Sequence, residues 1–294
     1  MRHIKEKQEY TLITGASSGI GKALATECAG RGMNLILVAL PGDDLEDLAW
    51  ELEARYEVRT VTFGIDLTAP ASAESIYEFC RSSGYKVNML INNAGRGFAG
   101  TFDASSPSLN DSLILLNIHS LVMLTQYFIT DLKQQDNAYI LNLGSMASFH
   151  PVPYKSVYAA SKSFVFSFSR SLREELKRTN VKVSVLCPGP VVTSAEVQAR
   201  IDKQGLLAKI PLMMPDAVAA IAIRKLLAGK PVIIPGFFNK FYMVLIKFIP
   251  RMVHQFVLER ALRRNVGRGI SHEISTIVQH EPVVVDTDSR VRVN

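Results

Sequence analysis

Short apolar runs alternate with amphipathic segments along most of the chain, and this alternation constrains the fold more than any other feature. The runs are rich in Val, Ile and Leu, and they lack the strict polar–apolar alternation of a half-exposed strand. Continuous apolar runs are typical of strands buried on both faces of a parallel sheet. The predicted strands are residues 10–14, 33–39, 58–64, 87–92, 138–144, 181–187 and 231–234.

Segments with helical periodicity lie between these runs. The predicted helices are residues 19–31, 43–56, 70–83, 107–133, 155–179 and 214–228. Strand–helix alternation sustained over this length predicts an α/β fold, a doubly wound parallel sheet of about seven strands with helices on both faces. The chain has 294 residues and is 48% hydrophobic, enough for a large core. We place one domain at residues 1–235 and an extension at 236–294.

Composition narrows the classes of partner and compartment. The formal charge of +6 comes without a Lys/Arg block interleaved with aromatics, so we expect no nucleic-acid binding. Cys28, Cys80 and Cys187 have neither metal-site nor CxxC spacing, which favours buried thiols in the cytoplasm and no metal. The charged segment Met1–Tyr10 does not resemble a secretory signal, and we expect no segment long enough to span a bilayer.

A glycine-rich turn, TGASSGIG (residues 14–21), joins the first predicted strand to the first predicted helix. Its glycines would let the backbone turn sharply and approach a ligand closely. The free N–H groups and positive dipole of the following helix suit a pyrophosphate. The spacing is G-x3-G-x-G, which differs from the G-x-G-x-x-G dinucleotide fingerprint. A plain glycine-rich turn remains the alternative.

Tyr158 and Lys162 stand four residues apart in the predicted helix 155–179, and therefore on one face. A nearby ammonium favours the phenolate and lowers a tyrosine pKa from about 10, which would suit proton exchange with a ketone or an alcohol. The alternative is a packed Tyr beside a solvated Lys. Ser145 follows the fifth strand at the ligand-binding edge of such a sheet, or serves as a helix N-cap. Asn117 interrupts an apolar helix, either buried with partners or exposed.

These residues together resemble one known family. TGASSGIG (14–21), NNAG (92–95), Asn117, Ser145, Tyr158, Lys162 and PGPVVT (188–193) occur in the order and spacing of the short-chain dehydrogenase/reductase family. The resemblance covers roughly residues 8–235. It implies a single Rossmann-type domain that binds a nicotinamide cofactor and also holds the substrate.

The resemblance also implies the roles of individual residues. Tyr158 would be the general acid/base, and Lys162 would lower its pKa and hold the nicotinamide ribose. Ser145 would polarise the carbonyl, and Asn117 would anchor a water that relays protons from Lys162. The cofactor-binding residues implied are Gly15, Ser17, Ser18, Gly19, Ile20, Gly21, Asp66, Leu67, Asn93, Ala94, Gly95, Tyr158, Lys162, Pro188, Gly189, Val191 and Thr193. Asp66 by itself is equally typical of a turn.

The sequence departs from the family pattern where the choice of cofactor is normally made. At the end of the second strand, an acid would bind the ribose diol of NAD, and a basic residue would bind the phosphate of NADP. Ala39 and Leu40 occupy these two places. Loss of the acid removes an obstacle to phosphate, so the sequence leans toward NADP(H).

Two further segments differ from a minimal member of the family. In the extension, residues 237–265 mix apolar and basic residues. We favour a helix that covers the substrate pocket or a dimer seam, over a segment resting on an anionic membrane and over a membrane span. Residues 190–215 fall where the family places its substrate lid, and the apolar residues among them favour an apolar enclosure for the substrate. These residues are Leu206, Leu207, Ile210, Leu212, Met213 and Met214.

The sequence therefore favours an NAD(P)-dependent oxidoreductase that acts on a small molecule, a hydrophobic ketone or secondary alcohol. By the resemblance, the protein would form a homo-oligomer. The alternative is a catalytically silent nucleotide-binding regulatory protein, or a membrane-peripheral protein, on the same fold. The presence of Tyr158, Lys162 and Ser145 disfavours a silent protein.

Overall fold

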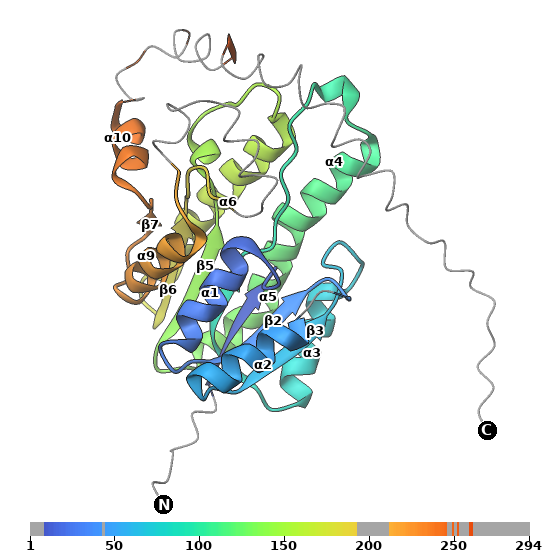
Figure 1. Ribbon diagram of the computed structural model, residues 1–294, viewed down its shortest axis with the longest axis vertical. Helices are drawn as coiled ribbons and strands as arrows, with labels where there is room; N and C mark the ends of the chain where they lie inside the picture. The colour runs from blue at the N-terminus through green and yellow to red at the C-terminus, as the bar shows by residue number, and fades with distance from the viewer. Residues whose placement is uncertain are drawn as a thin grey trace, which may run out of the picture.

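A seven-stranded parallel sheet forms the centre of the molecule in the computed structural model (Figure 1). The model describes residues 9–42, 45–192 and 212–245, together with residues 249, 252, 259 and 260. The strand order is β3-β2-β1-β4-β5-β6-β7. The strands are β1 Glu9–Thr14, β2 Asn34–Ala39, β3 Thr60–Gly64, β4 Lys86–Asn92, β5 Ala138–Leu143, β6 Val181–Leu186 and β7 Val232–Ile233. The predicted strands are thereby confirmed.

Helices cover both faces of this sheet, as the sequence predicts. The main helices are α1 Gly19–Ala29, α2 Leu45–Tyr56, α3 Ser72–Ser82, α4 Pro107–Ile114, α5 Ser120–Lys133, α6 Ser156–Glu175 and α9 Pro215–Leu227. Side chains of α1, α2 and α9 form one apolar core with the sheet. Side chains of α3 and α5 form a second apolar core on the other face of the sheet, with the strand side chains that point to that face. Figure 1 shows α1, α2 and α9 on the same side of the sheet.

The order in which strands join the sheet reverses at β1. Strands β2 and β3 lie on one side of β1, and β4 to β7 follow on the other side. Connections that leave neighbouring parallel strands in opposite directions open a crevice at the carboxyl ends of those strands. The loops after Thr14 and Asn92 meet at this point, which is where the fold places a ligand.

The predicted helix 107–133 is interrupted. A π-helical turn, η2, spans Leu115–His119 between α4 and α5 and contains the buried Asn117. Single π-turns inside helices are frequent at functional sites. By length and composition, Pro107–Lys133 is apolar enough to cross a membrane, which the sequence analysis did not expect. Its α5 part packs Leu124, Phe128 and Leu132 into the core beside β4 and β5, as in a core helix.

The C-terminal extension begins with helix α10, Phe237–Leu245. Its inward side chains are Asn239, which is buried, and Met243, which packs against a small core with Met146 and Val165. α10 contacts η3, the 3-10 turn Met146–Phe149. The extension therefore starts as a structured helix beside the loop that follows β5. The division into residues 1–235 and 236–294 remains a prediction.

Candidate active site

The glycine-rich turn after β1 packs tightly against the end of β4. Gly15 has φ +62°, and a Cβ on it would lie 3.0 Å from the Cα of Ala94. A Cβ on Gly21 would lie 1.9 Å from the Gly15 carbonyl oxygen and 2.5 Å from Asn93 Nδ2. Gly21 admits only glycine, because a larger side chain would collide with backbone, and Gly15 favours glycine because of its positive φ and the tight space around it. The turn is therefore held in one shape against residues 93 and 94.

Asn93 and Thr14 form hydrogen bonds between the glycine-rich turn and the end of β4. Asn93 Nδ2 donates to the carbonyl oxygens of Thr14, at 2.9 Å, and of Gly15, at 3.0 Å. The Thr14 hydroxyl accepts from the backbone N–H groups of Asn93 and Ala94. Asn93 thus supports the turn with its amide nitrogen, while its Oδ1 is buried without a partner in the structure.

The start of α1 suits the phosphates of a dinucleotide. Ser18 is the N-cap residue, yet its hydroxyl makes no capping bond to the helix. The first N–H groups of any α-helix, here from Gly19 onward, have no acceptor within the helix and carry its positive dipole end. A glycine cradle, a free hydroxyl and these N–H groups match what a pyrophosphate requires. The predicted residues Ser17, Ser18, Gly19 and Ile20 therefore lie together at this turn, and they fit the group.

Tyr158, Lys162 and Ser145 come together at the carboxyl end of β5. Tyr158 and Lys162 lie one turn apart on α6, with the Lys162 Nζ 5.9 Å from the centre of the Tyr158 ring. Lys162 is 3% exposed, and its Nζ donates to the Leu143 carbonyl at 2.8 Å. The Ser145 side chain shares a hydrogen bond with the Tyr158 phenol. The residues of the predicted proton-transfer group are therefore neighbours.

Burial controls the protonation of these groups. Burial raises the pKa of Tyr158, with a smaller opposing effect from the Ser145 hydrogen bond and a small raising effect from Cys187. Burial also lowers the pKa of Lys162 to about 8. The expected net lowering of the Tyr158 pKa is therefore wrong, because burial of the phenol disfavours the phenolate and Lys162 is not among the groups that shift this pKa.

Ser145 combines both roles that the sequence allowed. It is the N-cap of η3, where its hydroxyl accepts from the Ala147 N–H at 3.1 Å. The Ser148 hydroxyl accepts from the Ser145 N–H and donates to the Lys162 carbonyl oxygen at 2.8 Å. Ser148 thus ties the serine turn to the helix that carries Tyr158. Sequence reasoning missed Ser148, because only the capping geometry reveals its role.

Asn117 fixes the loop that follows NNAG. Its Oδ1 accepts from the Arg96 N–H at 2.8 Å, and its Nδ2 donates to the Arg96 carbonyl at 2.9 Å and to Ser161 Oγ at 3.1 Å. A Cβ on Gly95 would lie 3.0 Å from Asn117 Oδ1 and 3.1 Å from Lys162 Nζ. Asn117 is therefore buried with partners beside Lys162, and its role in a water relay remains a prediction.

The PGPVVT segment lies against η3 and α10. The Pro188 carbonyl accepts from the Met146 N–H at 2.9 Å, and Val191 pairs with Met213 as an isolated bridge. A Cβ on Gly189 would lie 2.3 Å from Asn239 Oδ1. Pro188, Gly189 and Val191 are thus placed next to the Ser145 turn. The predicted residue Thr193 and the lid residues Leu206, Leu207 and Ile210 lie outside the described residues.

The end of β2 and the loop after β3 border the other side of the crevice. Ala39 is buried, and Leu40 is 54% exposed where the family pattern expects a basic residue. Asp66 Oδ1 accepts from the Thr68 N–H and the Thr68 hydroxyl, both at 2.8 Å, so it forms the turn that was its alternative reading. Asp66 is exposed and Leu67 is buried. A contact of Asp66 with adenine remains a prediction.

Apolar side chains approach Tyr158 from the opposite side. A small crevice beside Tyr158 is lined by Phe98, Phe102 and Leu113, among other residues. A larger cavity of about 780 Å³ lies next to it along η3 and α6, and His150 lines it. The His150 ring lies 6.0 Å from that of Tyr242 on α10. Among the described residues, no cluster of His, Cys, Asp or Glu could hold a metal ion.

Comparison with protein families agrees with this geometry. The family model of the short chain dehydrogenases matches residues 9–204. The chain belongs to the short-chain dehydrogenase family. Tyr158, Lys162 and Ser145 all fall within the matched region. The predicted resemblance is thereby confirmed.

Two curated relatives in this family are similar at about one third identity. The bovine (Bos taurus) very-long-chain 3-oxoacyl-CoA reductase is 32% identical over 191 residues, 63% of this chain and 60% of the relative. The human (Homo sapiens) 17-beta-hydroxysteroid dehydrogenase type 3 is 34% identical over 195 residues, 65% of this chain and 62% of the relative. The match thus spans less than two thirds of the length of these relatives.

Solved structures of other short-chain dehydrogenases share the fold. The short-chain dehydrogenase from Sphingobium yanoikuyae in complex with NADPH has a TM-score of 0.69 and 29% identity, and the match covers 83% of this chain and 97% of that one. A 7beta-hydroxysteroid dehydrogenase has a TM-score of 0.78 at 24% identity, covering 85% of this chain and 96% of that one. The doubly wound, Rossmann-type sheet is therefore the family fold.

Proposed function

We propose that this short-chain dehydrogenase is an NAD(P)-dependent oxidoreductase that acts on a hydrophobic ketone or secondary alcohol. The observation that carries the proposal is the joint placement of Tyr158, Ser145 and the buried Lys162 at the end of β5. The glycine cradle at the end of β1 lies in the same crevice, joined to this group through Asn93, Ala94 and Gly95. A silent nucleotide-binding protein would not need this proton-transfer group.

The protonation states favour reduction of a ketone near neutral pH. Because burial raises the pKa of Tyr158, the phenol keeps its proton and can give it to a carbonyl oxygen. The Ser145 hydroxyl would hydrogen-bond to the same oxygen, and Lys162 would stabilise the phenolate that remains. The nicotinamide, when bound, supplies or accepts the hydride. The side chains of this chain hold the oxygen in place and move its proton.

For the cofactor, we propose a preference for NADP(H). Ala39 provides no carboxylate for the ribose diol, and the exposed Leu40 leaves space without negative charge at that position. The solved dehydrogenase from Sphingobium yanoikuyae, 29% identical to this chain, is in complex with NADPH. These observations support a phosphate-bearing cofactor.

A hydrophobic substrate is supported by the surroundings of Tyr158 and by the named relatives. Phe98, Phe102 and Leu113 line the crevice beside the phenol. The two curated relatives are named for a very-long-chain 3-oxoacyl-CoA and for a 17-beta-hydroxysteroid, and both names describe molecules with a large apolar part. The proposed substrate class is therefore a ketone with an extended apolar skeleton.

Turnover of a panel of ketones with NADPH and NADH tests this proposal. The panel should combine oxo fatty acyl derivatives and oxosteroids with short polar ketones as controls. We expect NADPH-dependent reduction of the apolar members. Tyr158→Phe should lower kcat by at least about 100-fold, the usual contribution of general acid catalysis, while the Kd for NADPH stays within a few-fold. Normal turnover by this variant would show that the acid is assigned to the wrong residue.

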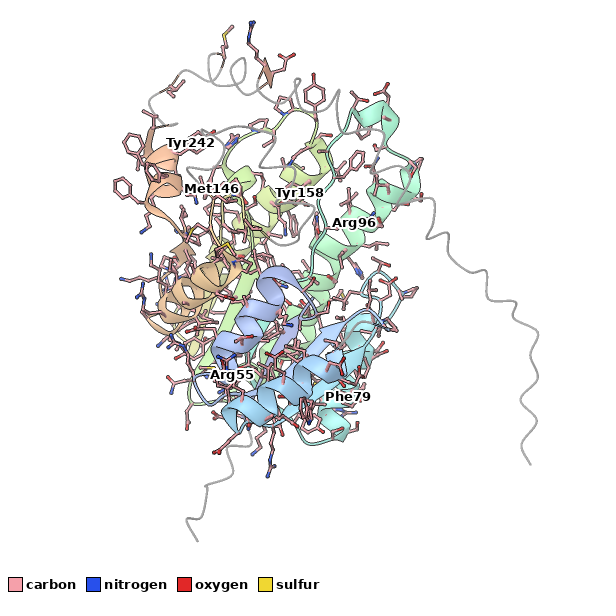
Figure 2. The ribbon with its side chains drawn as sticks, in the orientation of Figure 1. Arg55, Phe79, Arg96, Met146, Tyr158 and Tyr242 are labelled. Atoms are coloured by element: carbon pink, nitrogen blue, oxygen red, sulfur yellow. The ribbon has the colours of Figure 1, made fainter. Side chains whose placement is uncertain are left out.

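We also propose that the extension contacts the surface of an anionic membrane through helix α10, the alternative that the sequence alone ranked behind a helix covering the substrate pocket or a dimer seam. Helix α10 turns Asn239 and Met243 inward, whereas its outer face is apolar and exposed. This outer face consists of Phe237, Phe238, Phe241, Val244 and Leu245. Figure 2 shows aromatic side chains of α10 pointing away from the body of the molecule. An exposed apolar patch of this kind marks an interaction surface.

Positive charge beside this face supports a membrane as the occupant. Burial lowers the pKa of Lys225 on α9, and the neighbouring cations Lys240, Arg224 and Lys230 lower it further. In the sequence of residues 237–265, Glu259 is the one acid. The cations are Lys240, Lys247, Arg251, Arg260, Arg263 and Arg264. Aromatic side chains next to a cluster of cations are typical of helices that lie on anionic lipid.

Flotation with lipid vesicles tests the membrane contact. The full chain should float with phosphatidylserine-containing vesicles and less with pure phosphatidylcholine. Replacement of Phe237, Phe238 and Phe241 by serine should abolish flotation. Trp50→Ser is the matched control, since Trp50 is 74% exposed on α2, away from α10. The proposal is wrong if the triple variant still floats. It is also wrong if the three substitutions instead dissociate a dimer.

We further propose a homo-oligomer, in keeping with the family resemblance. Phe164 and Phe168 stack on α6 with their ring centres 6.0 Å apart, and Phe164 is exposed. An exposed aromatic ring that stacks on a partly buried one suits a contact between two copies. Light scattering of the purified protein should give a mass that is a multiple of 32.5 kDa. A monomer at micromolar concentration would exclude this proposal.

A further inference from the structure

Arg96 is held at the crevice by both of its backbone groups. Its N–H donates to Asn117 Oδ1 and its carbonyl accepts from Asn117 Nδ2, at 2.8 and 2.9 Å. Asn117 is 1% exposed and also bonds to Ser161 of α6. The backbone at residue 96 therefore has a fixed position relative to the helix that carries Tyr158.

The residues on either side of Arg96 place it between the two halves of the site. Gly95 approaches Lys162, and a Cβ on Gly97 would lie 3.7 Å from Tyr158 Cε2. Two residues before Arg96, Ala94 meets the glycine-rich turn. Figure 2 labels Arg96 and Tyr158 close to one another above the sheet. Because both neighbours are glycines, Arg96 contributes the side chain of this exposed Gly-Arg-Gly stretch.

The guanidinium of Arg96 is exposed and has no anionic partner in the described part of the chain. The ion pairs found there all involve other cations. The fold thus fixes the backbone of Arg96, while its charged side chain forms no ion pair with any described residue. Arginine is suited to such a place when it binds a carboxylate or a phosphate, because its planar donors can grip two oxygens at once.

We infer that Arg96 is an anion-binding residue of the catalytic cleft, whose guanidinium binds a carboxylate or phosphate group beside Tyr158. The anion belongs either to the substrate, next to its apolar skeleton, or to the cofactor. The inference rests on the proposed function and adds to it a preference for an anionic ligand group. No other described side chain of the loop 94–97 carries a charge that could do this.

The two sources of the anion are separated by measuring two quantities. The first is the ratio of kcat/KM for a medium-chain oxo acid to that for its methyl ester, which share the apolar skeleton and differ in charge. The second is the Kd for NADPH, measured by fluorescence without any ketone. Each is determined for the wild type, Arg96→Gln, Arg96→Lys and the control Arg178→Gln. Arg178 is an exposed cation just past the far end of α6.

If the substrate carries the anion, Arg96→Gln lowers the acid-to-ester ratio by about tenfold or more, as expected for a lost charge-assisted hydrogen bond. If the cofactor carries it, the same variant raises the Kd for NADPH by a similar factor. Arg96→Lys should recover part of either effect, and Arg178→Gln should show neither. An unchanged ratio together with an unchanged Kd would overturn the inference.

Failure of the proposed function would look different. In that case the wild type reduces neither ketone, and both sources of the anion are assessed by binding alone. Calorimetric titration of the oxo acid and of NADPH into wild type and Arg96→Gln then replaces the kinetic ratio. Equal affinities of the two proteins for both ligands would again overturn the role of Arg96.

Discussion

The side chain of Asn239 occupies the space beside Gly189 that any larger residue at position 189 would need. Asn239 is 4% exposed on α10 and donates from Nδ2 to the Pro235 carbonyl at 2.9 Å. Gly189 belongs to the segment that follows β6, and its neighbour Pro188 accepts from Met146 of η3. The first helix of the extension is thereby connected to the turn that carries Ser145.

Gly189→Ala should therefore disturb both the extension and the site. A Cβ at this position would lie 2.3 Å from Asn239 Oδ1 and 2.7 Å from its Cγ, so α10 or the loop must shift. We expect a loss of about 1–3 kcal/mol in the free energy of unfolding, the usual cost of overpacking. Urea denaturation measures this loss.

The double variant Gly189→Ala/Asn239→Ala separates a collision from other effects of the alanine. Removing the amide makes room for the new methyl group, so the double variant should lose less stability than the sum of the two single variants. Additive losses would mean that the two side chains do not compete for this space. Ser83→Ala, on the surface, serves as the control. Gly32→Ala does not, because Gly32 has a φ of +72° that would strain an alanine.

Lys162→Met should abolish turnover and yet stabilise the fold near neutral pH. Burial lowers the pKa of Lys162 from 10.5 to about 8, so the folded protein pays for holding an ammonium at 3% exposure. From this difference in pKa, Met should raise the free energy of unfolding by on the order of 1–3 kcal/mol at pH 7, after allowing for the lost bond to Leu143.

The pH dependence of this gain has a definite sign. Below pH 8 the lysine is charged in both the folded and the unfolded state, and its full destabilisation is present. Between pH 8 and 10.5 the unfolded state binds the extra proton, so the wild type gains stability as the pH rises. The advantage of Lys162→Met should shrink over this window. A constant difference between the variants from pH 6 to pH 10 would contradict the assigned pKa.

Asn117→Ala should reduce stability and turnover together. It removes the partners of the Arg96 N–H and carbonyl and of the Ser161 hydroxyl, and buried groups left unpaired cost about 1–3 kcal/mol. The loop that carries Gly95 and Gly97 would then no longer be fixed beside Lys162 and Tyr158. We expect kcat to fall by about tenfold or more, since misplaced groups lose orientation.

The pH profile of turnover distinguishes positioning from a general loss of folded protein. If Asn117 holds the loop beside Lys162, its removal lets water reach the ammonium, and the pKa of Lys162 should rise from about 8 toward 10.5 and shift the pH profile with it. Asn117→Asp keeps the acceptor for the Arg96 N–H but loses the donor, and should be intermediate in stability. A fall in kcat with an unshifted profile would argue for a structural role alone.

The strands and most helices could be predicted from the sequence because buried parallel strands and amphipathic helices leave strong periodic signals. The prediction located the run ending at Asn92 to within one residue, and for the helix carrying Tyr158 it placed the start one residue and the end four residues from those observed. Periodicity could not reveal the π-turn at Leu115–His119, because one extra residue in a turn barely changes an apolar pattern. The placement of Asn117 opposite Arg96 follows from that turn.

Three-dimensional contacts decided the parts of the site that the sequence left open or misjudged. The sequence showed Tyr158 and Lys162 on one face but could not show how deeply they are buried, and burial sets the direction of both pKa shifts. Ser148 and Gly97 carried no motif of their own, because their roles depend on neighbours distant in sequence. Asn239 had no signal in the apolar and basic pattern of the extension.

Ala39→Asp should shift the cofactor preference from NADP(H) toward NAD(H). Ala39 ends β2, its carbonyl accepts from the Ile65 N–H, and the exposed Leu40 follows it at the rim of the crevice. A carboxylate here would bond to a ribose diol and repel a phosphate on the same ribose. The ratio of kcat/KM for NADPH to that for NADH should fall by about tenfold to 100-fold, equivalent to about 1.4–2.8 kcal/mol.

Leu40→Arg, which adds a cation at the neighbouring position, should raise the same ratio. Steady-state kinetics with both cofactors gives the two ratios, and movement of both variants in one direction would show that the phosphate does not lie at the end of β2.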